Sequence, residues 1–343
     1  MIIIGTSALI AILAVVVVFI SGNFDIFFNS LRNAINLSTI WGRILYAVDA
    51  VPQILTHPLG LGYYGYFFAQ GSFQTGVYQV TYVHNDFLQL FLDAGWLAGV
   101  ALIFVVVKSL LSKKLPLLFK MLIICISVFS LLDFNLQYIL IFFLLILVLD
   151  FEDDFKKLKI KFSLPIKIAL CLFAVLNIYF AMVLGCELFG FNSVSLALYP
   201  NNTRIQLEQL TEIEDVSEAK ELADEIIEKN EYVAYAYNIE AMYYYSLGSF
   251  ENAITYKLKE IELSKYSIDC YTDLVYILAV GVQLYEEAGY TESAEYCKAY
   301  LVIIEDMLSE VEDNTSFIAY LINDTPELEL PDEYLQYITE FSS

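Results

Sequence analysis

The chain has 343 residues, 58% of them hydrophobic, and a formal net charge of −23. Because an ordinary soluble domain is roughly 45–50% apolar, this excess and a mean hydropathy of +0.61 indicate that much of the chain lies in lipid. Residues 201–343 hold 31 acidic but only 7 basic residues, so nucleic acid and anionic lipid head groups are not expected partners of this part.

Five apolar stretches have about the length of a membrane-spanning helix, which needs roughly 20 residues. They are residues 2–20, 87–107, 115–132, 136–150 and 164–187. The first follows Met1 without the basic flank of a signal peptide, so we expect a span there, in a chain that begins within a larger membrane domain. Residues 133–137 read as a tight turn, which predicts a hairpin of the third and fourth stretches.

Between the first two stretches lies a long loop, residues 21–86, which contains both histidines of the chain. Arg43 is predicted at the start of an amphipathic helix over residues 42–55. Its planar guanidinium matches the oxygens of a phosphate or diphosphate; alternatively, it snorkels from the membrane surface. His57-Pro58, with Gly60 and Gly62, predicts a turn that permits close backbone approach. His57 either takes part in the chemistry or only forms this turn.

The loop ends at His84-Asn85, where the second apolar stretch begins. Asn85 is predicted to be the N-cap of a helix that starts near Asp86. His84 then lies at the positive end of the helix dipole, which disfavours the imidazolium, and a neutral ring can accept a proton from a hydroxyl. The alternative is an interfacial histidine that bonds to the backbone. Asp93, two turns into the stretch, is either functional or reaches the interface.

The lysines set the expected orientation, because cytoplasmic loops are rich in Lys and Arg. One cluster is Lys108, Lys113 and Lys114, and the other is Lys156, Lys157, Lys159 and Lys161. With both clusters in the cytoplasm, the loop 21–86, the turn at residue 133 and everything after about residue 188 lie outside. We therefore divide the chain into a membrane domain, residues 1–190, and an acidic extracytoplasmic domain, residues 191–343.

The acidic domain shows helical periodicity over residues 205–310 and a 34-residue spacing between Ala219 and Ala253, the period of tetratricopeptide repeats. One unit has the expected aromatic, small and glycine positions: Tyr237, Ala241, Tyr244, Gly248, Phe250 and Ala253. A displaced unit contains Tyr285, Gly289 and Ala294. A generic helical bundle is the alternative. The predicted fold is thus all-α: about five spans, a large outer loop and a soluble, tetratricopeptide-like domain.

The sequence predicts neither a metal site nor a cofactor. The five cysteines, Cys125, Cys171, Cys186, Cys270 and Cys297, show no metal-ligand spacing. Cys270 and Cys297 both lie in the acidic domain, but whether they form a disulfide stays open at this point.

The order of the loop residues resembles the O-antigen ligase and polymerase superfamily. The resemblance rests on Arg43, then His57-Pro58-Leu59-Gly60-Leu61-Gly62, then His84-Asn85 followed by Leu88-Gln89, and then the acid Asp93 near Gly95. It covers about residues 40–110, which correspond to the family's large periplasmic loop and the span after it. Members with tetratricopeptide-like tails are familiar.

The resemblance implies a metal-independent glycosyltransferase of the bacterial plasma membrane whose donor is a lipid-linked oligosaccharide, typically on undecaprenyl diphosphate. The acceptor hydroxyl would belong to another glycan, a lipid or a protein. Carried over by position, the catalytic residues are Arg43, which engages the diphosphate, and His84, which engages the hydroxyl. The other residues expected to bind substrate are Arg32, His57, Asn85, Asp86 and Asp93. The tail would offer a surface to other glycan-assembly proteins.

Family members usually have ten or more spans, whereas five are counted here. We therefore expect a truncated product, a half that needs a partner, or a degenerate copy. This leaves a non-catalytic, membrane-anchored scaffold in envelope glycan assembly as the alternative function. A transporter of lipid-linked sugars receives no support, because the spans hold no paired charges.

Overall fold

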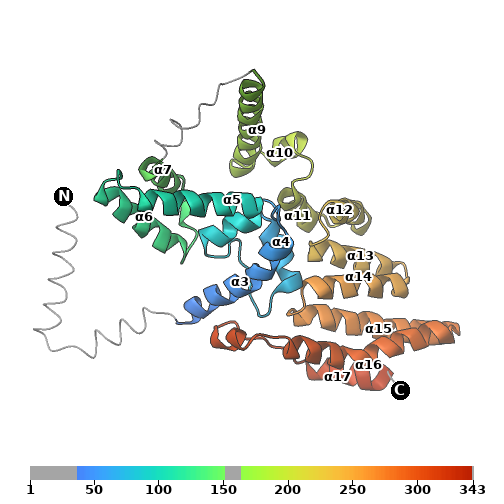
Figure 1. Ribbon diagram of the computed structural model, residues 1–343. Coiled ribbons are helices and arrows are strands. Elements are labelled where there is room, and N and C mark those ends of the chain that lie inside the picture. Colours follow the sequence, from blue (N-terminus) through green and yellow to red (C-terminus); the bar gives the residue numbers. More distant parts are fainter. Residues whose placement is uncertain (1–36, 151–163, 342–343) are drawn as a thin grey trace, which may run out of the picture.

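The computed structural model describes residues 37–150 and 164–341, and all regular secondary structure within them is helical (Figure 1). Three described helices are long and apolar enough to cross a membrane: α5 (Asp86–Leu111), α9 (Leu164–Leu188) and α15 (Ile268–Ala288). The predictions of an all-α fold and of helices suited to a membrane are confirmed at this level. The predicted first span and Arg32 lie outside the described residues.

The surroundings of these three helices differ. In α15, 56% of the apolar window is buried inside the protein, against 22% in α5 and 6% in α9. Leu274, Leu278 and Val282 of α15 belong to the largest apolar core of the C-terminal part. Protein packing therefore accounts for the apolar sequence of α15, whereas α5 and α9 leave most of their apolar surface exposed.

The predicted hairpin is present as α6 (Leu117–Ser130) and α7 (Ile139–Val148), joined through the short 3-10 helix η1 (Asn135–Gln137). Both pack on the second half of α5, where Val106, Ile123 and Leu145 share a core. The helices are shorter than the predicted stretches. At 1.5 Å per residue, α6 is about 21 Å long and α7 about 15 Å, less than the roughly 30 Å of a bilayer core. Hydropathy overestimated them because apolar residues continue beyond the helix ends.

The N-terminal end of α5 is held against the turn between α6 and α7. Asn85 Nδ2 donates to the Leu131 carbonyl over 3.2 Å, and Leu136 N–H donates to Asp86 Oδ2 over 2.9 Å. Asn85 also caps α5, since its Oδ1 accepts from Leu88 N–H, as predicted.

The C-terminal end of α5 is held against the end of α7. Asp150 N–H donates to Ser109 Oγ over 2.9 Å, and Lys108 Nζ donates to the Asp150 carbonyl over 3.3 Å. His84 and the turn at residue 133 therefore lie at one end of this three-helix unit, and Lys108 lies at the other. The predicted orientation likewise puts His84 and residue 133 on one side of the membrane and Lys108 on the other.

Within the outer loop, α3 (Leu37–Thr56) crosses α5, and α4 (Gly65–Phe73) follows (Figure 1). The buried carboxylate of Asp49 on α3 accepts three hydrogen bonds: from Thr75 N–H, from Thr75 Oγ1 and from Tyr78 Oη, over 2.7–2.9 Å. Buried polar groups need such partners. These bonds fasten the segment after α4 to α3.

The predicted turn at His57-Pro58 inserts into a kink of α5 at Gly95, where φ is +79°. The kink breaks the helical bond between Trp96 N–H and the Leu92 carbonyl, and the turn supplies both lost partners. Trp96 N–H donates to the Pro58 carbonyl over 3.0 Å, and Leu61 N–H donates to the Leu92 carbonyl. A Cβ on Gly95 would lie 2.4 Å from the Pro58 oxygen, so this close approach requires glycine.

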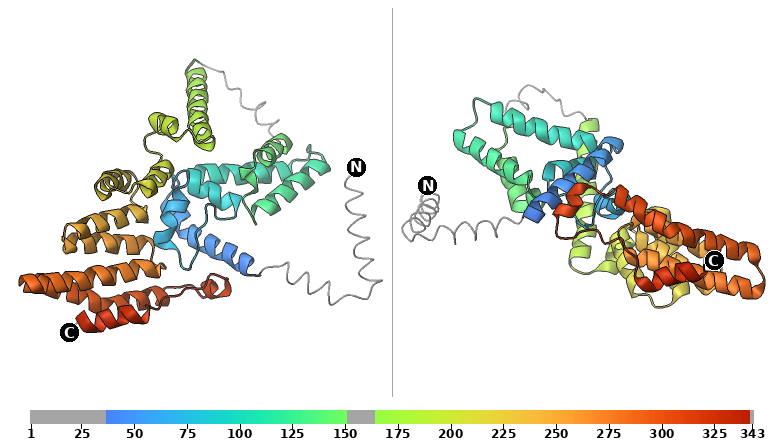
Figure 2. Two further views of the ribbon diagram at one scale, coloured as in Figure 1. Left: turned by 180° about the vertical axis from the view of Figure 1, so that it is seen from behind. Right: turned by 90° about the horizontal axis from the view of Figure 1, so that it is seen from below.

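After α9, the chain forms a stack of helices in which most pack on their neighbours in sequence, while the last, α17, packs mainly on α15 (Figures 1 and 2). They are α10 (Asn192–Leu198), α11 (Thr203–Glu212), α12 (Val216–Lys229), α13 (Ala234–Ser246), α14 (Phe250–Leu263), α15, α16 (Thr291–Asp313) and α17 (Asp332–Phe341). Ala219, Ala253 and Ala294 are buried at the crossings, as expected of small residues there. Cys270 and Cys297 are buried and free.

The end of the tail returns to the outer loop. Ser316 N–H donates to the Thr75 carbonyl, and Asn323 N–H donates to Ser38 Oγ, both over 2.8 Å. Between them, Ala319 of the 3-10 helix η2 (Phe317–Leu321) packs in one core with Leu45 of α3. The acidic tail and the outer loop are therefore physically joined, although the charge difference between them suggested two separate parts.

Candidate functional site

The carboxylate of Asp133 joins the two residues predicted to be catalytic. Its Oδ2 lies 3.2 Å from Arg43 Nη2, and its Oδ1 lies 2.9 Å from His84 Nδ1. Arg43 comes from α3, His84 from the end of the outer loop and Asp133 from the turn after α6. Arg43 and His84 are 90 and 49 positions from Asp133 in sequence. The crossing of α3 on α5 and the α6–α7 hairpin therefore bring the three residues together.

The backbone around the site fixes the directions of the His84 and Asp133 side chains. His84 has a φ of +53°, a left-handed conformation that costs energy outside glycine and is concentrated at functional positions. Asp133 Oδ1 also accepts from Phe134 N–H over 2.9 Å. Because Asn85 both caps α5 and bonds to the turn at Leu131, it holds His84 and Asp133 at the same place.

The charges favour an ionised Asp133. Partial burial raises the pKa of this carboxyl, but the hydrogen bonds from Phe134 N–H and His84 and the charge of Arg43 outweigh it and hold the pKa below its ordinary value. An ionised carboxylate only accepts hydrogen bonds, so His84 carries its proton on Nδ1. Nε2 lies on the far side of the ring and, in the neutral imidazole, is the nitrogen that can accept a proton. The same arrangement orients the histidine of hydrolase triads.

Arg43 keeps binding capacity beyond its ion pair. Its Nη2 is directed at Asp133, while its buried Nε has no hydrogen-bond partner among the described residues. The side chain is 32% exposed, so the guanidinium is reachable from outside. A partner with several oxygens, such as a phosphate, would match the exposed part of this side chain. Arg43 is therefore paired with Asp133 within the candidate site.

Aromatic rings cover the sides of His84. The ring centroid of Phe134 lies 5.0 Å from that of His84, and Tyr46 lies 6.0 Å away. Tyr82 lies 5.3 Å from Phe134 and continues the aromatic surface. The base is thus placed among apolar faces, where water is partly excluded.

The other predicted substrate-binding residues have structural contacts. His57 Nδ1 lies 3.0 Å from the Gln53 carbonyl, in the turn that fills the α5 kink. Asp86 accepts from the α6–α7 turn, as described above. Gln89 accepts from Val83 N–H and donates to Asp93 Oδ1 over 2.8 Å, so it connects Asp93 to the loop just before His84. No contact places His57 or Asp93 against the Arg43–Asp133–His84 group.

Comparisons with protein-family models, with curated proteins and with solved structures found no match for this chain.

Asp133 is the functional residue that the sequence analysis missed. It was assigned only to a tight turn. One signal could have drawn attention to it: it is an isolated acid between two apolar stretches, on the same expected side of the membrane as Arg43 and His84. Nothing in the sequence, however, specifies which of its neighbours in space it pairs with.

Proposed function

We propose that this chain is a bacterial plasma-membrane glycosyltransferase of the O-antigen ligase or polymerase type, acting in surface polysaccharide assembly. It would move a glycan from an undecaprenyl-diphosphate donor to a hydroxyl acceptor. The observation that carries the proposal is the Asp133 carboxylate, which holds a histidine base and an arginine on its two oxygens. A displacement with a diphosphate leaving group needs both of these functions at one place.

The reaction assigns one step to each residue. The acceptor oxygen attacks the anomeric carbon of the donor sugar, and its proton passes to Nε2 of His84. The bond between the anomeric carbon and the phosphate oxygen breaks, and undecaprenyl diphosphate leaves with the electron pair. Arg43 stabilises the charge that develops on the diphosphate. Asp133 stabilises the imidazolium that forms and keeps the ring in place.

In this proposal α5 and α9 span the bilayer, the α6–α7 hairpin lies in it beside α5, and the predicted first span completes the membrane part. The end of α5 with His84 faces outward, and the end with Lys108 faces the cytoplasm. The exposed apolar surfaces of α5 and α9 support this arrangement. The site then lies at the outer membrane surface, where the diphosphate of a lipid-linked donor is found.

The test is surface-polysaccharide transfer in cells that lack their own copy of the protein. We expect His84→Ala and Arg43→Ala each to reduce transfer roughly a hundredfold or more, with unchanged amounts of protein in the membrane. Lys113→Ala is the matched control, since it removes an exposed charge near the opposite end of α5. Wild-type transfer by both site variants would refute the proposal.

The alternative is a non-catalytic membrane-anchored scaffold, and the stacked helices of the tail favour it as a second candidate. Deleting the tail does not separate the two functions, because residues 316–323 hold the outer loop in place. The point variants do separate them. A scaffold tolerates His84→Ala and Arg43→Ala, whereas a transferase does not.

A further inference from the structure

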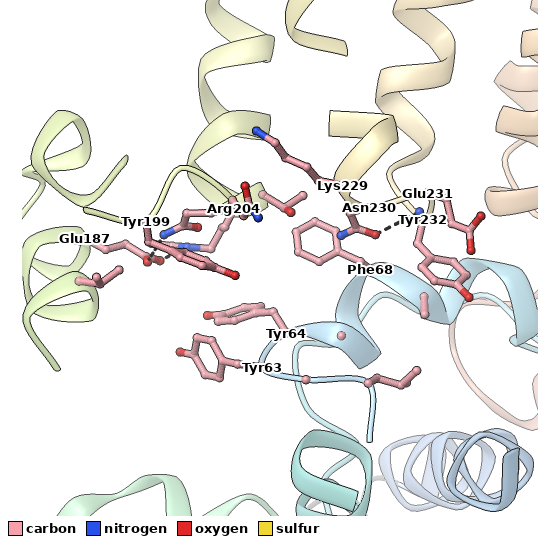
Figure 3. Close-up of a pocket in the computed structure, with 18 of the residues that line it drawn as sticks. Tyr63, Tyr64, Phe68, Glu187, Tyr199, Arg204, Lys229, Asn230, Glu231 and Tyr232 are labelled. Carbon is pink, nitrogen blue, oxygen red and sulfur yellow. Dashed lines mark hydrogen bonds and ion pairs between the residues drawn. The ribbon is translucent and has the colours of Figure 1, made fainter. Parts of the chain in front are cut away.

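A second feature of the outer surface is a cavity of about 990 Å³ beside the first turn of α4 (Figure 3). Three separate parts of the chain form its walls: residues 61–69 of the outer loop, the end of α9 with residues 199–204, and residues 227–232 at the end of α12 and just after it. Figure 3 shows Tyr63 and Tyr64 on one side, across from Tyr199 and Arg204. The cavity exists only because the tail folds back over the outer loop.

The lining combines aromatic faces with polar groups, and its three carboxylates outnumber its two cations by one. Arg204 Nε pairs with Glu187, and Asn202 Nδ2 donates to the same carboxylate over 2.9 Å. The neighbouring Lys229 is offset by Glu228 and Glu231 in the same wall. With no excess of positive charge, the cavity is not built for a phosphate or another anion. Ring faces and amides beside it suit a neutral ligand that has both apolar and hydroxyl-bearing surfaces.

The backbone is strained at one of these aromatic residues, Tyr64. Tyr64 has a φ of +60° at the N-terminus of α4, a conformation that tyrosine rarely adopts. Its ring lies with its centroid 6.0 Å from the Arg204 guanidinium and 4.6 Å from Tyr63, which meets it edge-on. The two tyrosines thus form a fixed aromatic platform, and Tyr63 is 60% exposed.

A line of rings connects this platform with the site. Tyr64 lies 6.5 Å from Tyr82, Tyr82 lies 5.3 Å from Phe134, and Phe134 lies 5.0 Å from His84, between ring centroids. A linear ligand that stacks on the platform would therefore be led along aromatic faces to the base. The C–H face of a sugar ring stacks on the electron-rich face of an aromatic ring, while its hydroxyls reach amides and charged groups at the edge.

We infer that the cavity binds an oligosaccharide, the body of an acceptor glycan whose terminal hydroxyl reaches Nε2 of His84. This inference rests on the proposed function and selects a glycan among the three classes of acceptor that the sequence leaves open. The excess of one carboxylate in the lining argues against a phosphorylated lipid head group. The row of rings, which runs from the cavity toward His84, argues for an elongated ligand.

The experiment measures binding of oligosaccharides, released by mild acid from the surface polysaccharide of the source cells, to the full chain in detergent. We compare the wild type with Tyr63→Ala and with Tyr64→Gly, which removes the ring and also relieves the left-handed strain. Each should weaken binding roughly threefold to tenfold. Tyr290→Ala is the control, because Tyr290 is 63% exposed on the tail, outside the cavity, and should bind as the wild type does.

A fourth variant separates this inference from the proposed function. His84→Ala should keep most of the oligosaccharide binding, because other residues line the cavity, although it should not transfer glycan. If Tyr63→Ala and Tyr64→Gly bind normally, or if the wild type does not bind, the inference is wrong even where His84→Ala abolishes transfer. If the tyrosine variants lose binding of undecaprenyl phosphate or of a peptide and not of the sugars, the inference is overturned too. Sugar binding that is lost in the tyrosine variants supports it, even if transfer is never detected.

Discussion

At the scale of single residues, the role of Asp133 leads to a specific prediction. Asp133→Asn keeps the shape of the side chain but removes the charge that pairs with Arg43 and orients His84. We expect transfer to fall roughly 10²- to 10⁴-fold, the range of a lost or misoriented general base, with little change in the melting temperature. The measurement is the transfer rate together with thermal unfolding in detergent.

The control for this variant is Asp306→Asn, which makes the same change at an exposed position on α16. Its transfer rate should equal that of the wild type. If Asp133→Asn transfers glycan normally, the bridge has no part in the reaction, and His84 would have to be oriented by the Asn85 cap alone.

The sequence identified Arg43 and His84 but not their partner, for a physical reason. Arg43 was recognised by its guanidinium in a loop poor in cations, and His84 by its place before a helix. Both are local signals. The pairing with Asp133 depends on the register between the hairpin and α5, which buried contacts such as that of Asp86 with Leu136 determine. No local pattern encodes this register.

At the scale of elements, α13 contains a buried acid whose titration should control tail stability. Both carboxylate oxygens of Glu240 lack a hydrogen-bond partner among the described residues, and Lys220 Nζ lies 3.8 Å away. Burial and the adjacent Asp224 raise the pKa of Glu240 from 4.5 to about 7, against the opposing effect of Lys220. The folded state therefore binds this proton more tightly than the unfolded state does.

The sign of the pH effect follows from that shift. A raised pKa stabilises the fold at low pH, and this contribution is lost as the pH rises through about 7. Glu240→Gln cannot ionise, so at pH 8.5 its free energy of unfolding should exceed that of the wild type by an amount on the order of 1–3 kcal/mol. It should therefore unfold at a higher temperature. At pH 5.5 the gain should be smaller, because the folded wild type still holds its proton and only the unfolded chain ionises. Thermal unfolding followed by circular dichroism at both pH values measures the difference.

The matched control is Glu221→Gln, at an exposed position on α12. It should leave the melting temperature of the wild type unchanged at both pH values. If Glu240→Gln raises the melting temperature equally at pH 5.5 and pH 8.5, packing, and not ionisation, is responsible.

Most helices could be predicted from the sequence, because apolar periodicity, the Asn85 cap and the glycine-containing turns are local signals. The interruption of α5 at Gly95 was not predicted. It depends on partners from Pro58 and Leu61, more than 30 positions earlier, which replace the broken helical bond. The lengths of α6 and α7 were also overestimated, since hydropathy measures composition and not hydrogen bonding.

At the scale of the whole molecule, the outer loop is held between the membrane helices and the tail. Figure 2 shows α3 and α4 between the stack of tail helices and α5 to α7 in both views. Close packing supports this arrangement, because a Cβ on Gly71 of α4 would lie 1.8 Å from the Leu263 carbonyl of α14. Charge and composition divide the chain into two parts, but they do not reveal a contact of this kind. The cavity beside α4 is equally invisible in the sequence.

The return of the tail to the outer loop should therefore matter for transfer, although it lies far from His84 in sequence. Ala319 is fully buried against Leu45 and close to Gly76. Ala319→Asp places an unpaired charge there, at a cost of about 3–5 kcal/mol, which exceeds what the two nearby hydrogen bonds contribute. We expect faster proteolysis within residues 74–80 and reduced transfer, with α12 to α15 still folded. Ala299→Asp, at an exposed position on α16, should change neither. If Ala319→Asp resists proteolysis and transfers glycan normally, the outer loop holds its shape without the tail, and the α3–α5 crossing alone must position Arg43.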